Sequence, residues 1–88
     1  MKQRKPSHPG ELLQRLYLDE MEMTQTDLAE KIGCRHAQVN LVIKGKRGIT
    51  PEFALELERV LKVAAETWLN LQVKYDLWEA RQHLKKRA

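Results

Sequence analysis

Gly33 lies between two short stretches of sequence in which apolar residues recur with helical spacing. Thr24 can cap the first stretch, and Asp27, three residues later, makes a weak capping box with it. Apolar residues at i, i+3 and i+4 mark the second stretch: Val39, Val42 and Ile43. Because glycine adopts the left-handed conformation at little cost, Gly33 can end the first helix and begin a turn. Residues 24–44 are therefore predicted to form two short helices joined by a tight turn.

Helical spacing also marks the segments on either side of this pair. A first helix is expected over about residues 10–19, with four residues buried: Leu12, Leu13, Leu16 and Tyr17. Thr50 and Pro51 make a strong start for a fourth helix, because a cap is followed by proline in the first helical position. The apolar positions of that helix are Phe53, Ala54, Leu57, Val60 and Leu61. A last helix is expected over about residues 65–84.

The domain organisation follows from these segments. No segment alternates apolar and polar residues as a strand would, so the predicted fold is all-α with five helices. A chain of 88 residues allows one domain with a small core. We expect a flexible basic arm over residues 1–8, one domain over 9–84 and a basic tail over 85–88.

Basic and acidic residues are separated along the chain. The formal net charge is +4, which alone is a weak indication of a partner. Residues 31–51 include five basic residues and no acid, whereas residues 19–30 include five acids and no base. A surface polarised in this way can orient a protein on a phosphate backbone. The alternative is that the basic cluster is an ordinary solvated surface.

Several classes of protein are disfavoured by the sequence. No apolar run is long enough to span a membrane, and no apolar stretch follows the basic N-terminus as it would in a secretory signal. Cys34 is the single cysteine, so no internal disulfide can form and a reducing, cytoplasmic location is expected. Cys34 and His36 lack the partners of a structural metal site, and no metal or cofactor is expected. No nucleophile and base can be placed together, which argues against an enzyme.

Four blocks of sequence carry a resemblance to a known family. Residues 24–29 (TQTDLA) are followed by Gly33, Val39 and residues 45–47 (GKR), a pattern that resembles the Xre, or lambda-repressor, type of helix-turn-helix. Three flanking blocks are similar to those of the HigA antitoxins, also grouped as VapI-like proteins: residues 8–11 (HPGE), 48–51 (GITP) and 68–78 (WLNLQVKYDLW). The resemblance covers about residues 8–80.

The resemblance implies a five-helix, lambda-repressor-like DNA-binding domain. It also implies a homodimer that represses its own operon and neutralises a HigB-like toxin, a ribosome-dependent mRNA endonuclease. The chain departs from the family at three caps or turns. Arg35 stands where the second helix of the pair usually has a Ser or Thr cap, and Glu22 stands where glycine is frequent. Lys62 and Ala64 replace the usual glycine and cap before the last helix, so local helix starts are expected to be weak.

The residues expected to contact DNA follow from the position of each in such a helix pair. The second helix enters the major groove, where exposed side chains meet base edges. The expected base contacts are His36, Ala37, Asn40 and Leu41, of which Asn40 can pair bidentately with adenine. The expected phosphate contacts are Gln25, Arg35, Gln38, Lys44, Lys46 and Arg47. The alternative for Ala37 and Leu41 is that they are simply half-exposed helix residues that contact no DNA.

The last predicted helix carries two apolar rows. The first row is Trp68, Leu71, Tyr75 and Trp78, and the second is Leu69, Val73, Leu77, Ala80 and Leu84. One row would close the core of the domain, which leaves the other for a partner. Because large aromatic residues are typical of interfaces, the first row is expected to form a homodimer. The alternative is that both rows are buried in the core.

Two other functions remain open from the sequence. A stand-alone Xre-type transcriptional regulator without a toxin partner would have the same domain. A helical module that binds protein or RNA would show no preference for duplex DNA. The leading hypothesis is a sequence-specific, DNA-binding repressor with an antitoxin role.

Overall fold

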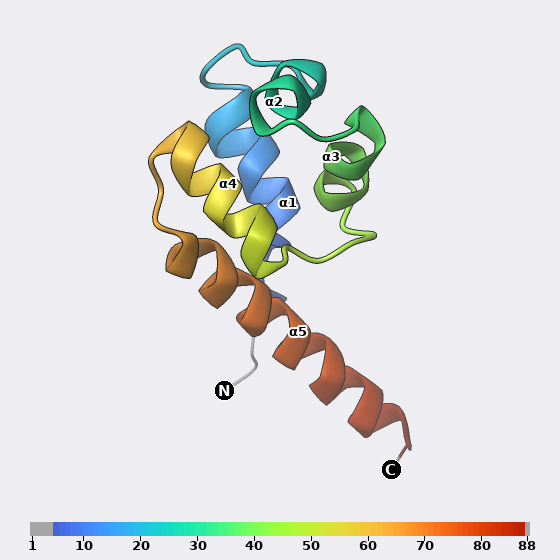
Figure 1. Cartoon of the computed structure of the whole chain (residues 1–88). Helices are drawn as coiled ribbons and strands as arrows, with labels where there is room; N and C mark the ends of the chain where they lie inside the picture. The colour runs from blue at the N-terminus through green and yellow to red at the C-terminus, as the bar shows by residue number, and fades with distance from the viewer. Residues whose placement is uncertain (1–4, 88) are drawn as a thin grey trace.

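The computed structural model describes residues 5–87, which form helices joined by short turns and loops, with no strand among those residues (Figure 1). The elements in chain order are α1 (Pro9–Leu12), the π-helical segment η1 (Leu13–Leu18), α2 (Gln25–Ile32), α3 (His36–Ile43), α4 (Pro51–Leu61) and α5 (Ala65–Arg87). α1 and η1 together form the first predicted helix, so the predicted all-α fold of five helices is confirmed. α5 runs to Arg87 and includes most of the segment expected as a tail.

The predicted helix boundaries arise from local hydrogen bonds. Thr24 Oγ1 accepts from the backbone N–H of Asp27 at 3.0 Å, and Asp27 Oδ2 accepts from the backbone N–H of Thr24 at 3.1 Å, which completes a capping box. Gly33 ends α2 with a φ of +87°, in the left-handed region. Thr50 Oγ1 accepts from the N–H of Phe53 at 3.2 Å at the start of α4. These predicted caps are confirmed.

One predicted core residue is exposed instead. Leu13 and Leu18 are fully buried, whereas Leu16 is 52% exposed. In η1 the backbone N–H of Asp19 donates to the carbonyl of Gln14 at 2.8 Å, an i to i+5 bond in place of the α-helical i to i+4 bond. The wider turn places residues five apart on the same face. The prediction that Leu16 is buried was wrong because it assumed α-helical spacing.

The core lies where α1, η1, α2, α3 and α4 meet the first half of α5 (Figure 1). Its fully buried large side chains include Leu13, Leu18, Leu28, Val39, Val42, Leu57 and Trp68. The ring of Trp68 lies 5.3 Å from that of Tyr17, centroid to centroid. α5 continues well beyond this core, which gives the molecule an elongated shape of 45 × 23 × 22 Å.

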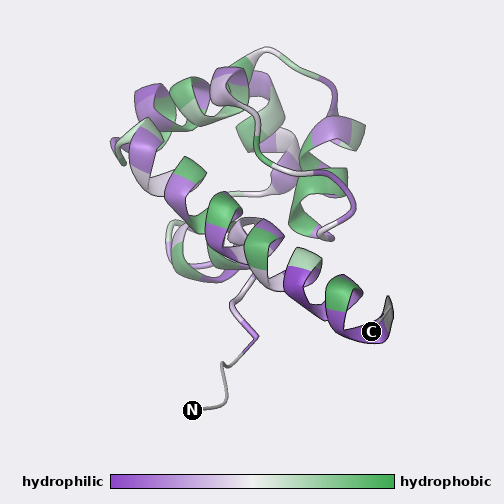
Figure 2. Ribbon diagram, turned by 90° about the horizontal axis from the view of Figure 1, so that it is seen from below, coloured by the Kyte–Doolittle hydropathy of each residue, from purple (hydrophilic) through white to green (hydrophobic). Residues whose placement is uncertain are grey.

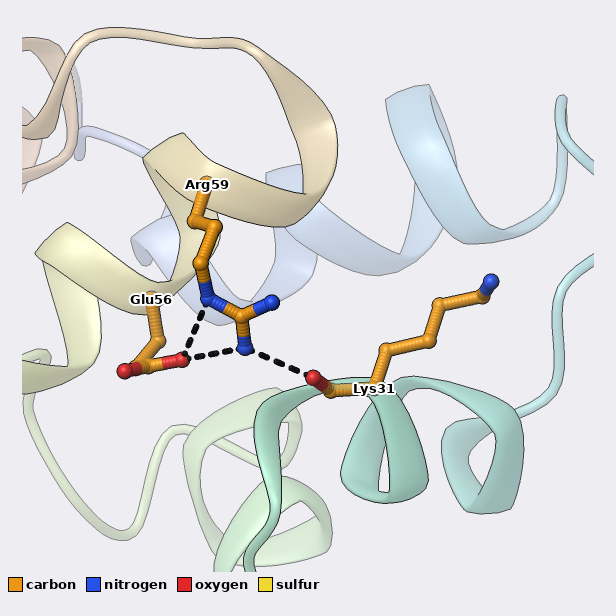
Figure 3. A network of polar contacts seen from close by, with 3 residues as sticks. All are labelled: Lys31, Glu56 and Arg59. Carbon is orange, nitrogen blue, oxygen red and sulfur yellow. Dashed lines mark hydrogen bonds and ion pairs between the residues drawn. The ribbon is translucent and has the colours of Figure 1, made fainter.

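Arg59 joins α4 to the end of α2 (Figure 3). Its Nη2 donates to the backbone carbonyl of Lys31 at 2.7 Å, and Glu56 accepts from the same guanidinium at 2.6 and 3.1 Å. The last carbonyls of a helix have no partner within the helix, so Arg59 satisfies one of them. The contact fixes the C-terminal end of α2, and hence the turn into α3, relative to the core.

The N-terminal segment contacts α5 through His8 and Lys5. His8 is buried, and its Nδ1 accepts from the backbone N–H of Gly10 at 2.9 Å, which caps α1. The His8 ring meets the ring of Tyr75 edge-on, with centroids 4.8 Å apart. Lys5 Nζ lies 5.4 Å from the centroid of Trp78. Within the arm expected over residues 1–8, Lys5 and His8 therefore both contact α5, and residues 1–4 lie outside the described residues.

Two positions where the resemblance predicts glycine adopt glycine-like backbone conformations. Glu22 has a φ of +53° and Lys62 a φ of +62°. The left-handed region is costly for residues with a Cβ, because Cβ approaches the following carbonyl oxygen. Lys62 also serves as the C-cap of α4. Both side chains are exposed, so the preference for glycine at these two positions comes from the backbone conformation and not from a lack of space for a side chain.

Candidate nucleic-acid interface

α2 and α3 pack closely because small and β-branched residues lie between them. Ala29 on α2 is 3% exposed, and Val39 and Val42 on α3 are fully buried beneath the helix. Gly10 of α1 lies so close to α3 that an added Cβ would overlap the backbone carbonyl of Val42. α3 is thus fixed on one side by the core, and its opposite side faces solvent.

The solvent-facing side of α3 includes the residues expected to contact base edges, together with Lys44, an expected phosphate contact. Ala37, Leu41 and Lys44 are exposed and Asn40 is half-buried, at the i, i+3, i+4 and i+7 positions of one helical stripe. His36, one turn before Asn40, is exposed beside the stripe. No side chain within residues 5–86 covers these positions fully. A groove-inserted helix needs such a face, since base edges are read by protruding side chains.

Asn40 is joined to α2 by a side-chain hydrogen bond. Its Nδ2 donates to Oε1 of Gln25 at 2.9 Å, and both residues are half-buried. Gln25 Nε2 in turn contacts Oε1 of Gln14 at 3.4 Å, and Gln14 Nε2 donates to Oδ1 of Asp19 at 2.6 Å. Gln25 is the first residue of α2, where the helix N-terminus favours a phosphate. The expected base-reading and phosphate-binding amides therefore touch each other.

Arg35 and Gln38 share the start of α3. Arg35 is the N-cap residue, but its side chain makes no capping hydrogen bond because a guanidinium has no acceptor. Gln38 Oε1 instead accepts from the backbone N–H of Arg35 at 3.3 Å. Gln38 lies off the stripe and lines an open pocket of about 370 Å³ with Arg47 and Glu52. Its expected role as a phosphate contact competes with this local hydrogen bond.

The basic loop after α3 is held in place from both ends. Gly45 adopts a φ of +75°, and the N–H groups of Lys46 and Arg47 donate to the carbonyl of Leu41 at 2.9 and 3.2 Å. Further on, the N–H of Ile49 donates to Oε1 of the buried Gln72 at 2.8 Å. Lys44, Lys46 and Arg47 are all exposed on this loop. A loop with a fixed backbone and exposed, positively charged side chains is suited to contact the phosphate backbone of DNA.

The predicted dimer row of α5 is used mainly within the chain. Trp68 is 1% exposed and belongs to the core, so its assignment to a dimer interface was wrong. Leu71, Tyr75 and Trp78 are half-buried, the last two against the N-terminal segment. Helix packing selects this row as the inner one because it continues the surface of α5 that meets α1 and α4.

The second row of α5 is the exposed one. Val73, Leu77 and Leu84 are 53%, 47% and 64% exposed. Apolar positions recur along the length of α5 in Figure 2, including the part that extends past the core. Large exposed apolar residues at helical spacing on a projecting helix are typical of a surface that a partner covers.

Cys34 packs in the turn between α2 and α3, as expected of a small apolar residue. Burial raises the pKa of its thiol above the ordinary value, which keeps the thiol protonated. Within residues 5–87 no three His, Cys, Asp or Glu residues are grouped as metal ligands. No helix in this part of the chain has the length and apolar character needed to cross a membrane.

Comparison with known proteins places this geometry in a family. The family model described as helix-turn-helix matches residues 14–68. The HTH-type transcriptional regulator YbaQ of Escherichia coli is 36% identical over 82 residues, which cover 93% of this chain and 73% of that protein. Virulence-associated protein I of Dichelobacter nodosus is 39% identical, with 85% and 69% covered. Antitoxin HigA-1 of Vibrio cholerae is 34% identical, with 97% and 80% covered.

The chain belongs to the helix-turn-helix family, in the group of HigA and VapI.

Solved structures of HigA-like proteins share the whole fold. A putative antidote protein of a plasmid maintenance system from Nostoc punctiforme has a TM-score of 0.91 at 37% identity, with 96% of this chain and 91% of that chain covered. Pseudomonas aeruginosa HigA, solved with the higBA promoter, has a TM-score of 0.88 at 33% identity, with 93% and 89% covered. Antitoxin GraA in complex with its operator has a TM-score of 0.88 at 32% identity, with 99% and 88% covered.

Sequence reasoning missed two residues that are hydrogen-bonded to the candidate interface. Gln14 and Asp19 lie before the helix pair, and neither was expected near the DNA-facing side. Gln14 is eleven positions from Gln25 in sequence, and Gln25 fifteen from Asn40, as the separations of the two hydrogen bonds give. No periodicity within one helix links such positions. The fold brings them together by placing η1 beside the start of α2.

Proposed function

We propose that this chain is a sequence-specific DNA-binding repressor and the antitoxin of a HigBA-type system. The observation that carries the proposal is the solvent-facing stripe of α3, flanked by the basic loop; its residues are Ala37, Asn40, Leu41 and Lys44. GraA and Pseudomonas aeruginosa HigA, which share the fold, were solved with an operator and with a promoter. In this arrangement α3 enters the major groove and α2 crosses the backbone. Such a protein acts in the cytoplasm, on bacterial DNA.

Within the proposed interface the side chains divide by chemistry. His36, Ala37, Asn40 and Leu41 read base edges, with Asn40 matched to adenine N6 and N7. The residues that bind phosphates and set the salt dependence are Gln25, Arg35, Gln38, Lys44, Lys46 and Arg47.

The test is fluorescence anisotropy with DNA from upstream of the gene and a scrambled duplex, each at about 50 and 200 mM salt. We expect a preference of about 10³ or more for the upstream DNA, with a steep salt slope. Asn40→Ala should weaken binding to the upstream duplex more than to the scrambled one. Lys46→Ala should weaken both alike, whereas Lys74→Ala, an exposed lysine of α5, should change neither. Equal, weak binding to both duplexes would favour the alternative of a protein-interaction module.

The proposed homodimer uses the exposed row of α5. A two-fold dimer places two copies of α3 one helical turn of DNA apart, which suits a palindromic operator. Val73, Leu77 and Leu84 supply the apolar contact. In sedimentation equilibrium, Leu77→Asp should produce monomers. Leu55→Asp is the matched control, because Leu55 is 58% exposed on α4 and outside the row, and it should leave the dimer intact.

The antitoxin role predicts a HigB-like partner encoded beside this gene. Co-expression should allow the two proteins to purify together and should relieve growth arrest by the toxin. Operator binding without any such partner would identify the chain as a stand-alone Xre-type regulator, the second candidate function.

A further inference from the structure

Three amides and one carboxylate at the proposed DNA-facing side form a directed chain of hydrogen bonds. It runs from Asp19 through Gln14 and Gln25 to Asn40, with donor–acceptor distances of 2.6, 3.4 and 2.9 Å. An amide has a donor end and an acceptor end, and each can in principle be reversed by rotation about the last side-chain bond. The three amides are therefore coupled, since reversing one would bring two donors or two acceptors together.

Asp19 sets the direction of this chain. An ionised carboxylate has only acceptors, so the end of Gln14 that meets Asp19 must be the NH2 group. Oε1 of Gln14 is then left to accept from Nε2 of Gln25. Oε1 of Gln25 is in turn left to accept from Nδ2 of Asn40. Each link transmits the same polarity to the next residue.

The last link determines what Asn40 offers to DNA. With one N–H bound to Gln25, Asn40 keeps its other N–H and Oδ1 for a ligand. One donor and one acceptor match adenine, which presents N7 as acceptor and N6–H as donor in the major groove. In the reversed state Oδ1 would meet Gln25 and the NH2 group would face outward. Two outward N–H groups would suit guanine, which presents only the acceptors N7 and O6.

We propose that Asp19 and Gln14 are positioning residues that fix the amide of Asn40 for adenine and against guanine. Neither needs to touch DNA for this role. The inference rests on the proposed function of Asn40 as a base contact. According to this proposal, the preference for adenine over guanine at one base pair depends on the carboxylate of Asp19, which is three hydrogen bonds away from Asn40.

The decisive variant is Asp19→Asn, which replaces the carboxylate by an amide that can present either end to Gln14. The probes are the duplex that the unmodified protein selects from a randomised pool, and the same duplex with the A·T pair read by Asn40 changed to G·C. One wrong base pair costs about 5- to 150-fold in affinity. The quantity measured is the ratio of the affinities for the A·T and the G·C duplex. We expect Asp19→Asn to lower this ratio by about 2- to 10-fold, which corresponds to the net contribution of one neutral hydrogen bond.

Two controls separate hydrogen-bond direction from charge. Glu20→Gln removes the same charge from the adjacent exposed residue, so it should raise affinity for both duplexes and leave their ratio unchanged. The double variant Asp19→Asn with Gln14→Glu moves the carboxylate one link along at constant net charge. The carboxylate at position 14 accepts from Gln25 Nε2, so the ratio should return to that of the unmodified protein.

The outcomes distinguish this inference from the proposed function. If Asn40→Ala abolishes the ratio while Asp19→Asn leaves it intact, the chain of amides does not set specificity although Asn40 does. If Asn40→Ala leaves the ratio intact, the base-contact assignment fails and this inference with it. A readout without DNA is the pair of ¹⁵N–¹H signals of the Asn40 side chain. The chemical shifts of these signals should change in Asp19→Asn and should return to those of the unmodified protein in the double variant. Unchanged chemical shifts in Asp19→Asn would overturn the proposal.

Discussion

Gln72 on α5 accepts a hydrogen bond from the backbone N–H of Ile49 at 2.8 Å, across 23 positions of sequence. Both residues are buried, and Nε2 of Gln72 donates to Oδ1 of Asp76 at 2.9 Å. This bond ties the loop that carries Lys46 and Arg47 to the long helix of the proposed dimer. The position of the interface loop therefore depends on a side chain of α5.

Replacing Gln72 should test that link. Gln72→Leu leaves the buried N–H of Ile49 without an acceptor, so unfolding free energy should fall by about 1–3 kcal/mol. Asn70→Leu is the control, because Asn70 is exposed on the same helix and its replacement should cost within about 0.5 kcal/mol. Urea denaturation followed by circular dichroism measures both. Equal costs for the two variants would contradict the role of the Ile49 bond.

The left-handed residue at the end of α4 offers a stabilising substitution. Lys62→Gly should raise the unfolding free energy by about 0.5–1 kcal/mol, because glycine adopts a positive φ without strain. Lys74→Gly in the interior of α5 should instead lower it by about 1 kcal/mol. Thermal unfolding of the two variants and of the unmodified protein shows whether each substitution raises or lowers the stability. A loss of stability in Lys62→Gly would contradict the reading of its backbone as strained.

The uncapped start of α3 predicts a conflict between stability and DNA binding. Arg35→Ser supplies a hydroxyl oxygen that can accept from the first turn of α3, so stability should rise by about 1 kcal/mol. If Arg35 binds a phosphate, the same variant should bind all duplexes less tightly, with a log–log salt slope shallower by about 0.9. Thermal unfolding and salt-dependent anisotropy measure the two effects. Unchanged affinity would remove Arg35 from the phosphate contacts.

His8 should make stability depend on pH below neutrality. Burial lowers the pKa of His8 below 6.5, against the opposing effects of Asp76, Glu11 and Glu79. The folded state therefore prefers neutral His8, whose Nδ1 accepts from Gly10. This contribution is fully present above the unfolded pKa and is lost as pH falls through the lower, folded-state pKa.

The matched variant is His8→Asn, which keeps an acceptor for the cap but does not titrate near neutrality. Between about pH 7.5 and pH 5, the melting temperature of the unmodified protein should fall more than that of His8→Asn. Parallel curves would show that His8 does not carry the pH dependence.

The sequence by itself determined the helix pair and its boundaries. Thr24, Gly33 and Thr50 act through hydrogen bonds and φ angles within a few residues, so local chemistry is sufficient. The exposed positions of α3 follow from its own periodicity, because Val39 and Val42 can only face inward. The family motifs added the expected turn positions at 22 and 62, where the backbone is left-handed.

Only the tertiary structure decided the features that depend on two distant segments. The two apolar rows of α5 are equivalent in a sequence pattern, and packing against α1, α4 and the N-terminal segment selects the row of Trp68 as the inner one. The exposure of Leu16 depends on an i to i+5 hydrogen bond that apolar spacing does not reveal. The chain from Asp19 to Asn40 exists only because η1, α2 and α3 meet, since hydrogen bonds act over a few ångströms and not along the sequence.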